Sequence, residues 1–127
     1  MSLFELLVKE IGNFIDQEPI ITESRLEEKI SDYIKSKGIM IENQVSKKED
    51  RYDLICRNGK ETVCVELKIK ASIKDIKQFD RYFPKFRDGF IVVCWQASFH
   101  LKMDFESVKK QSPIPIELIE LSKRYSY

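Results

Sequence analysis

The sequence predicts an α/β domain with a mixed central sheet of about five strands, flanked by helices. Asn58 and Gly59 form the strongest short-range hairpin signal and separate two apolar runs, which indicates an antiparallel pair of strands. The short, fully apolar run at residues 90–95 follows a helical pattern. It therefore predicts a central strand that joins the preceding strand through a right-handed parallel crossover.

Composition bounds the class of protein. The chain has 127 residues, of which 43% are hydrophobic and 34% charged, as in a single globular domain. No apolar run reaches about 18 residues, so we expect no membrane span. The three cysteines lie in apolar runs without metal-ligand spacing. Together with the absence of a signal-peptide pattern, this predicts a reduced, cytoplasmic protein.

Charge constrains a nucleic-acid partner. Lys and Arg total 22 against 21 acids, a net charge of +1, whereas a dedicated binder of double-stranded DNA is usually more basic. Any nucleic-acid surface must therefore come from local clustering of basic residues. The charged loop at 46–51 offers Lys47, Lys48 and Arg51, either as a solvated connection or as contacts to phosphates.

The first predicted element is an amphipathic helix at about 2–16, opened by a capping box of Ser2 and Glu5. Its wide apolar stripe can dock on its own domain or on a second copy of the chain, and the first is favoured. A second helix is predicted from Ser24 to Lys37. Ser24 and Glu27 form another capping box there, and Gly38 stops the helix.

A strand at 39–45 leads through the charged loop to the hairpin of 52–68. With Asn58 and Gly59 as the loop of a type I′ turn, Asp53 lies opposite Cys64, and Glu66 lies further along the same face. Lys68 projects from that face as well, because side chains alternate along a strand. Two carboxylates on an apolar hairpin repel each other, and a divalent cation removes that cost. Mg²⁺ or Mn²⁺, held by Asp53 and Glu66, is the expected cofactor.

At these residues the chain resembles the PD-(D/E)xK nuclease superfamily, which has the restriction-endonuclease-like fold. Asp53 followed by Glu66-Leu67-Lys68 is similar to the D…(D/E)xK signature, and the hairpin is especially similar to that of archaeal Holliday junction resolvases. Tyr52 stands where the family usually has proline. The resemblance implies Mg²⁺-dependent cleavage of DNA phosphodiesters. It also implies that Asp53, Glu66 and the carbonyl of Leu67 bind metal and that Lys68 orients water.

The resemblance extends to both neighbouring helices. The resolvases carry a glutamate on the first core helix, and Glu27 matches its place, with Glu23 as the alternative; the competing interpretation is that Glu27 only closes the capping box. A helix begun by Ser72 and ended by Pro84 follows Lys68. Gln78 and Tyr82, four residues apart on one face of it, resemble the QxxxY motif of RecB-like nucleases.

The remaining residues predict a last helix at about 105–110 with a basic end and an edge strand at 114–121. His100 is the only histidine and is expected to be a loop or packing residue. Residues 1–127 are thus expected to form one nuclease-like domain with an extra N-terminal helix.

Two functional classes remain open from sequence. The first is a nuclease, either resolvase-like or RecB-like, that acts on DNA as a homodimer through the first helix or Tyr125 to Tyr127. The second is a domain without catalysis that keeps the fold to bind nucleic acid or protein. The complete set of Asp53, Glu66 and Lys68 favours the nuclease.

Overall fold

The structure, a computed structural model, describes residues 1–48 and 50–124. Its helices are α1 (Leu3–Gly12), α2 (Glu23–Ser36), α3 (Ile76–Tyr82) and α4 (Phe99–Gln111). Its strands are β1 (Met40–Lys47), β2 (Asp50–Asn58), β3 (Glu61–Ala71), β4 (Phe90–Ala97) and β5 (Ile116–Glu120). Short 3₁₀ turns, η1 (Ile73–Asp75), η2 (Phe83–Lys85) and η3 (Ser122–Arg124), flank α3 and follow β5.

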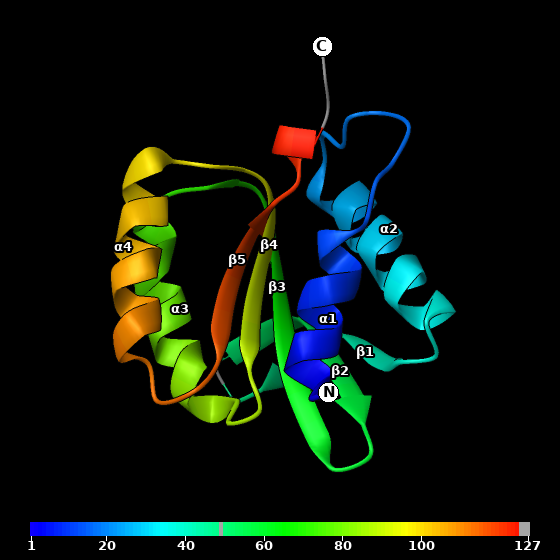
Figure 1. Ribbon diagram of the computed structural model, residues 1–127, viewed down its shortest axis with the longest axis horizontal. Helices are drawn as coiled ribbons and strands as arrows, with labels where there is room; N and C mark the ends of the chain where they lie inside the picture. The colour runs from blue at the N-terminus through cyan, green and yellow to red at the C-terminus, as the bar shows by residue number, and fades with distance from the viewer. Residues whose placement is uncertain (49, 125–127) are drawn as a thin grey trace.

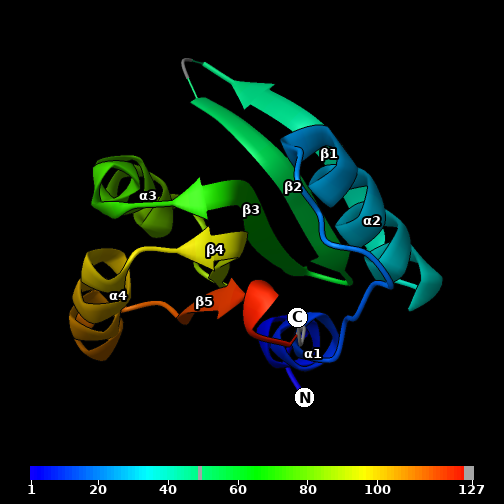
Figure 2. The ribbon, with the colours of Figure 1, turned by 90° about the horizontal axis from the view of Figure 1, so that it is seen from above.

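The described strands form one mixed sheet in the order β1-β2-β3-β4-β5. The pairs β1·β2 and β2·β3 are antiparallel, whereas β3·β4 and β4·β5 are parallel and are connected through α3 and α4. Helices α1 and α2 cover one face of the sheet, and α3 and α4 cover the other (Figures 1 and 2). The predicted α/β class, the five-stranded mixed sheet and the flanking helices are confirmed.

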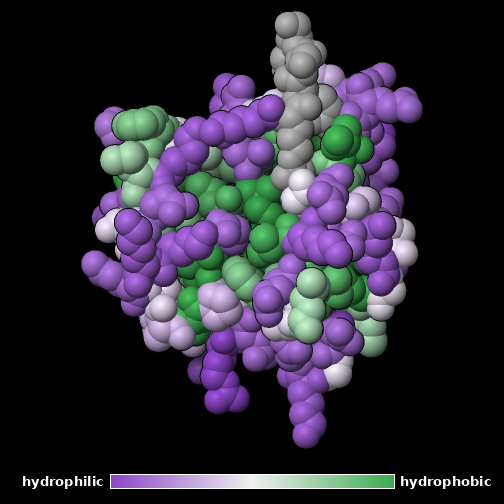
Figure 3. Space-filling view, viewed as in Figure 1, coloured by the Kyte–Doolittle hydropathy of each residue, from purple (hydrophilic) through white to green (hydrophobic). Residues whose placement is uncertain are grey.

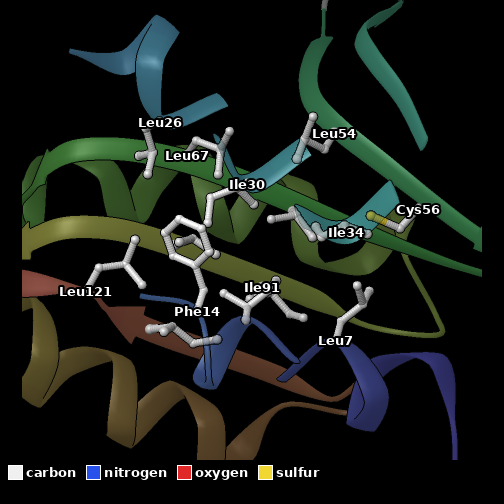
Figure 4. Packing of buried hydrophobic residues seen from close by; sticks show 14 of the residues in the cluster. Leu7, Phe14, Leu26, Ile30, Ile34, Leu54, Cys56, Leu67, Ile91 and Leu121 are labelled. Atoms are coloured by element: carbon white, nitrogen blue, oxygen red, sulfur yellow. The ribbon is translucent and has the colours of Figure 1, made fainter. Parts of the chain in front are cut away.

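Each face of the sheet has its own hydrophobic core. Between the sheet and α1 and α2, residues such as Leu7, Ile30 and Leu54 pack together with no more than 1% of their surface exposed (Figure 4). The core under α3 and α4 is aromatic, with Phe90 at the centre of edge and tilted ring contacts. These two layers fix the position of β3, the strand that carries Glu66 and Lys68.

Helix α1 keeps its predicted start and ends earlier than expected. Ser2 and Glu5 form the predicted capping box, but the helix stops at Gly12 instead of reaching 16. Its buried residues, Leu3, Leu7 and Ile11, pack on the chain's own core. Intrachain docking is therefore confirmed, and this stripe cannot also be a free surface for a second copy. The other predicted contact, Tyr125 to Tyr127, lies outside the described residues.

The N-cap of helix α2 lies two residues before the predicted cap, Ser24. The N-cap is Thr22, whose side chain accepts the backbone N–H of Arg25, so the predicted capping box of Ser24 and Glu27 is wrong. Two hydroxyl residues two positions apart competed for one cap, and Thr22 holds the extended backbone that a cap requires. The correction leaves the Glu27 side chain without the structural role proposed for it.

The C-terminal half differs from prediction in its boundaries. Helix α4 begins at Phe99, well before the predicted 105, because Ser98 caps it by accepting the backbone N–H of Leu101. Strand β5 begins at Ile116, directly after Pro115, which cannot donate to a ladder. His100 lies exposed in α4, among neither the cores nor the residues of the cleft described below.

Hydrophilic side chains cover most of the face shown in Figure 3, with a hydrophobic area near its centre in the region of β4 and β5. Within residues 1–48 and 50–124, no helix is long and apolar enough to cross a membrane.

Candidate active site

The hairpin of β2 and β3 has a different register from the predicted one. Asn58 pairs with Glu61, so the two loop residues are Gly59 and Lys60. Gly59 has a φ of +61°, and neither Asn58 nor Lys60 has a positive φ. Positive φ at the first loop position only is typical of a type II′ turn with Gly first, whereas the predicted type I′ turn needs it at both.

The corrected register brings the two acids closer than predicted. The last ladder pair is Leu54 with Val65, so the next residues across the hairpin are Asp53 and Glu66. The predicted partner of Asp53, Cys64, pairs with Ile55 instead. The predicted diagonal relation between the carboxylates thus becomes one of opposite positions, one step beyond the last ladder pair.

Side chains replace the ladder at this point. The backbone N–H of Asp53 donates to Oε1 of Glu66 at 3.0 Å, and the backbone N–H of Leu67 donates to Oδ2 of Asp53 at 2.8 Å. Each hydrogen bond engages one named oxygen of a carboxylate, so the second oxygen of each can serve a ligand. The strands therefore hold both carboxylates rigidly, side by side.

The neighbouring strand β1 is also interrupted at Asp53. Pairing of β1 with β2 runs to Asn43 and Leu54 and resumes at Val45 and Tyr52. The skipped residue, Gln44, has a φ of +51°. Strand β2 twists at this point. Leu54 packs in the α1/α2 core, whereas Tyr52, two residues before it, packs in the aromatic core on the other face of the sheet. Asp53 thus lies where β2 rotates between the two cores.

Glu66 is a buried acid with 3% of its surface exposed. Burial raises the pKa of its carboxyl group to about 8, and the negative charge of Asp53 acts in the same direction. The thiol of Cys64, 3.5 Å from Oε1, and the N–H of Asp53 oppose the shift only in part. Perturbed acids of this kind gather at functional sites, where a bound cation reverses the cost of ionisation.

Lys68 follows Glu66 on the same face of β3 and lines the same cleft. Its Nζ lies 3.8 Å from Oδ1 of Asp75, while Oδ2 of Asp75 accepts the backbone N–H of Ser72. Ser72 and Asp75 form a capping box that opens η1 before α3, so the predicted start of a helix at Ser72 is confirmed. One carboxylate therefore starts the helix and orients the lysine.

The two candidate glutamates on α2, Glu23 and Glu27, both line the cleft. Glu27 accepts hydrogen bonds from the side-chain amides of Gln44 and, at 3.4 Å, of Asn43. Glu27 thereby contacts the residue that interrupts β1 opposite Asp53. Glu23, in the first turn of α2, lines the same cleft. The interpretation that Glu27 only closes a capping box is wrong, and Glu23 remains the alternative for the glutamate of this helix.

Gln78 and Tyr82 lie together on α3, as their spacing predicts. The side-chain amide of Gln78 donates to the hydroxyl of Tyr82 at 3.2 Å, and that hydroxyl donates to the backbone carbonyl of Arg51 at 3.2 Å. Tyr82 is 2% exposed and packs edge-on against Tyr52. The pair therefore ties α3 to the segment that leads into Asp53.

All these side chains meet at one cleft of about 690 Å³. The predicted residues that line it are Glu23, Glu27, Asp53, Glu66, Leu67, Lys68, Gln78 and Tyr82. Gln44 and Arg81 also line it and were not predicted, because neither stands at a motif position. Only a structure reveals Gln44, whose contribution depends on a positive φ in a strand.

The donor set suits a hard cation. Asp53 and Glu66 offer carboxylate oxygens. The backbone N–H and C=O of one strand residue point to the same side of the strand. Because the N–H of Leu67 donates to Asp53, its carbonyl also points toward β2. Among the residues that the structure describes, no three His, Cys, Asp or Glu side chains form a metal-binding group. Two carboxylates and a carbonyl match Mg²⁺, which keeps several waters.

No protein-family model matches the chain, and no curated protein matches it.

Proposed function

We propose that this protein is a Mg²⁺-dependent nuclease of the PD-(D/E)xK type that hydrolyses phosphodiester bonds in DNA. The observation that carries the proposal is that Asp53 and Glu66 lie opposite each other one step beyond the last ladder pair and exchange backbone-to-carboxylate hydrogen bonds, with Lys68 in the same polar cleft. A solvated surface hairpin would not bury Glu66 or raise its pKa to about 8. A divalent cation in the cleft would offset the electrostatic cost of holding the two carboxylates together.

Each residue has a distinct proposed role. Asp53, Glu66 and the carbonyl of Leu67 would hold the cation, which supplies Lewis-acid stabilisation of the phosphate and a more acidic water. Lys68 would hold the attacking water or offset charge on the phosphate, since its ammonium projects from the strand face that bears Glu66. Glu27, with Glu23 as the alternative, faces the same cleft from α2 and can hold a water.

Gln78 and Tyr82 would act as positioning residues. Their hydrogen bonds end on the carbonyl of Arg51, two residues before Asp53, so they hold the strand that presents the first acid. This connected pair supports a RecB-like relationship, whereas the similarity of the hairpin supports a junction resolvase. Both readings give metal-dependent cleavage and differ in the DNA structure preferred.

A homodimer accompanies the resolvase version of the proposal. Cutting a symmetric junction on both strands requires two active sites, and a two-fold dimer is the commonest way to supply them. With the stripe of α1 buried in its own chain, the dimer contact must come from another surface. Light scattering that gives a monomer mass, near 15.0 kDa, with and without DNA would reject this part of the proposal.

A nicking assay separates the nuclease from a domain without catalysis. Plasmid, linear duplex and four-way-junction DNA are incubated with the protein in Mg²⁺, Mn²⁺ or EDTA, beside Asp53→Asn. We expect cleavage that requires metal and is lost in Asp53→Asn. A wild-type protein that binds DNA but cuts none of these substrates would instead establish the binding module.

A further inference from the structure

A group of basic side chains continues from the cleft along the surface. Arg51 and Arg81 line the cleft itself, and Lys47, Lys48 and Lys85 line an adjacent hollow of about 250 Å³. We name these five residues the basic track. We propose that the basic track binds backbone phosphates of the DNA strand next to the cleaved bond, and that Asp50 anchors two of its residues, Arg81 and Lys85. This inference rests on the proposed function.

Asp50 is a buried acid at the start of β2. Only 6% of its surface is exposed. Oδ1 lies 3.0 Å from Nη2 of Arg81, and Oδ2 contacts Nζ of Lys85 and, at 3.4 Å, the hydroxyl of Tyr52. A buried carboxylate needs such partners, because an unpaired charge away from water is costly. Asp50 therefore ties β2 to both α3 and η2.

The partners of Asp50 still present their charge to solvent. The side chains of Arg81 and Lys85 remain 57% and 47% exposed although each contacts Asp50. The guanidinium of Arg81 also lies over the ring of Tyr82, 5.3 Å from its centroid. Asp50 and Tyr82 thus fix the direction of Arg81, and a pre-oriented guanidinium loses less entropy when it binds a phosphate.

Lys47 and Lys48, at the turn between β1 and β2, form the side of the hollow that faces Lys85. Lys47 and Lys48 are both exposed, and Lys48 has a φ of +57°. They line one hollow together with Asp50, Tyr52, Lys85 and Phe86, so the turn and η2 face each other across it. Glu49 lies outside the described residues.

Charge identifies the occupant. The whole chain has a net charge of +1, yet the five cations of the basic track gather along one side of the four carboxylates that line the cleft, with Asp50 as their anchoring acid. A metal site handles one phosphate, and a polymer that carries a phosphate at every nucleotide must place the next ones nearby. Basic residues along the path of the chain supply those contacts without reading sequence. A DNA backbone therefore suits the basic track better than a single small anion.

The test measures binding apart from cleavage. Fluorescein-labelled single-stranded and duplex DNA are titrated in Ca²⁺ at several salt concentrations with wild type and the pair Lys47→Ala/Lys48→Ala. Losing two phosphate contacts should lower the slope of log K against log salt by about 1.4 on single strands and about 1.8 on duplex. The matched control is Lys35→Ala/Lys110→Ala, which removes two exposed lysines from the ends of α2 and α4.

The outcomes separate the two proposals. An unchanged slope for Lys47→Ala/Lys48→Ala, or an equal drop in the control, overturns the basic track even if the protein cuts DNA. A selective drop establishes the track even if no cleavage is found, in which case the nuclease proposal alone fails. Binding of neither form of DNA by the wild type overturns the track as well.

A further variant tests the anchoring role. Asp50→Asn removes a negative charge, so a purely electrostatic effect would tighten binding. If Asp50 orients Arg81 and Lys85, Asn should instead weaken DNA binding while thermal melting still shows a folded protein. Tighter binding by folded Asp50→Asn overturns the anchoring role. If Asn prevents folding, Arg81→Gln takes its place, and losing this one contact must lower the salt slope by about 0.7 on single strands and about 0.9 on duplex.

Discussion

Asp53 and Glu66 lie on opposite strands of the hairpin, one step beyond its last ladder pair, and the strand of each donates a backbone N–H to the carboxylate of the other. Donors from the backbone cannot move away, so the two charges stay together whether or not a counterion is present. Burial and repulsion then act on one acid, Glu66. The arrangement stores an electrostatic cost that a divalent cation can remove.

We therefore predict that Mg²⁺ or Mn²⁺ stabilises the fold. A ligand that binds only the native state raises stability by mass action, by about 2.7 kcal/mol at one hundred times its Kd. Asp53→Asn should reduce this metal effect, and the metal-free variant should be no less stable, because the amide oxygen still accepts from Leu67 while one repelling charge is lost. Thermal melts across a metal titration measure both effects.

Ca²⁺ and EDTA arms serve as controls for that melt. A Tm that does not move with millimolar Mn²⁺ would argue against a cation at Asp53 and Glu66. A Tm shift that survives unchanged in Asp53→Asn would place the cation elsewhere.

The raised pKa of Glu66 predicts how stability depends on pH. At pH values between the ordinary pKa of a glutamate, 4.5, and about 8, Glu66 keeps its proton in the native state and has lost it in the unfolded chain. Stability therefore falls as pH rises through this window and levels off above it. Urea unfolding at a series of pH values in EDTA should show this fall.

Glu66→Gln is the matched control for the pH series, because the neutral amide resembles the protonated acid and cannot ionise. The variant should flatten the profile between about 4.5 and 8 and exceed wild type in stability at the upper end. Saturating Mg²⁺ should flatten the wild-type profile too. An equally steep fall in Glu66→Gln would assign the proton to another group.

Strong local patterns predicted the elements of the fold well. The capping box at Ser2, the helix start at Ser72 and the apolar run that became β4 lie where expected, and a hairpin forms around Gly59. The predicted boundaries of helices and turns were wrong where two neighbouring residues could each act as the cap or form the turn. Thr22 and Ser24 both can cap α2, and Asn58-Gly59 and Gly59-Lys60 both allow a two-residue turn. Local chemistry leaves such choices to tertiary packing.

The candidate site was predictable to the extent that it follows motifs. Asp53, Glu66, Lys68, Gln78 and Tyr82 stand at motif spacings, and the structure brings them to one cleft. Gln44 and Asp50 were not predicted, since their roles depend on a positive φ in β1 and on ion pairs with residues more than thirty positions away. Neither property has a signature in the neighbouring sequence.

Two glycines should differ in their tolerance of alanine. At Gly89, φ is +143° and an added Cβ would lie 2.6 Å from Cδ2 of Phe4, a residue of α1. At Gly59, φ is +61° and the space is open. Gly59→Ala should cost about 1–2 kcal/mol for the left-handed backbone alone, and Gly89→Ala clearly more. Urea unfolding decides, and equal costs would mean that α1 does not pack against this turn.

Gln78 and Tyr82 should act as a unit. Tyr82→Phe removes the hydroxyl that receives from Gln78 and donates to the carbonyl of Arg51, at a stability cost of about 0.5–1.5 kcal/mol. We expect Gln78→Ala, Tyr82→Phe and the double variant to give non-additive losses of cleavage rate, with a coupling of about 0.5–3 kcal/mol. Strictly additive losses would show that the two residues serve separate functions.

Lys68 separates an enzyme from a binding module. Its Nζ projects from the face of β3 that bears Glu66, beside Asp75, and can reach a water or phosphate oxygen in the cleft. Lys68→Ala should lower the single-turnover cleavage rate by about 10²–10³, the usual loss for one transition-state contact. DNA affinity in Ca²⁺ should change far less, because only one phosphate contact among several is removed.

Lys70→Ala is the matched control, since Lys70 is an exposed lysine on the same strand that lines a different hollow. It should leave both rate and affinity close to wild type. Cleavage at full rate in Lys68→Ala would keep the nuclease but remove Lys68 from its mechanism. A loss of affinity as large as the loss of rate would mean that Lys68 binds the DNA ground state, because uniform binding does not accelerate the chemical step.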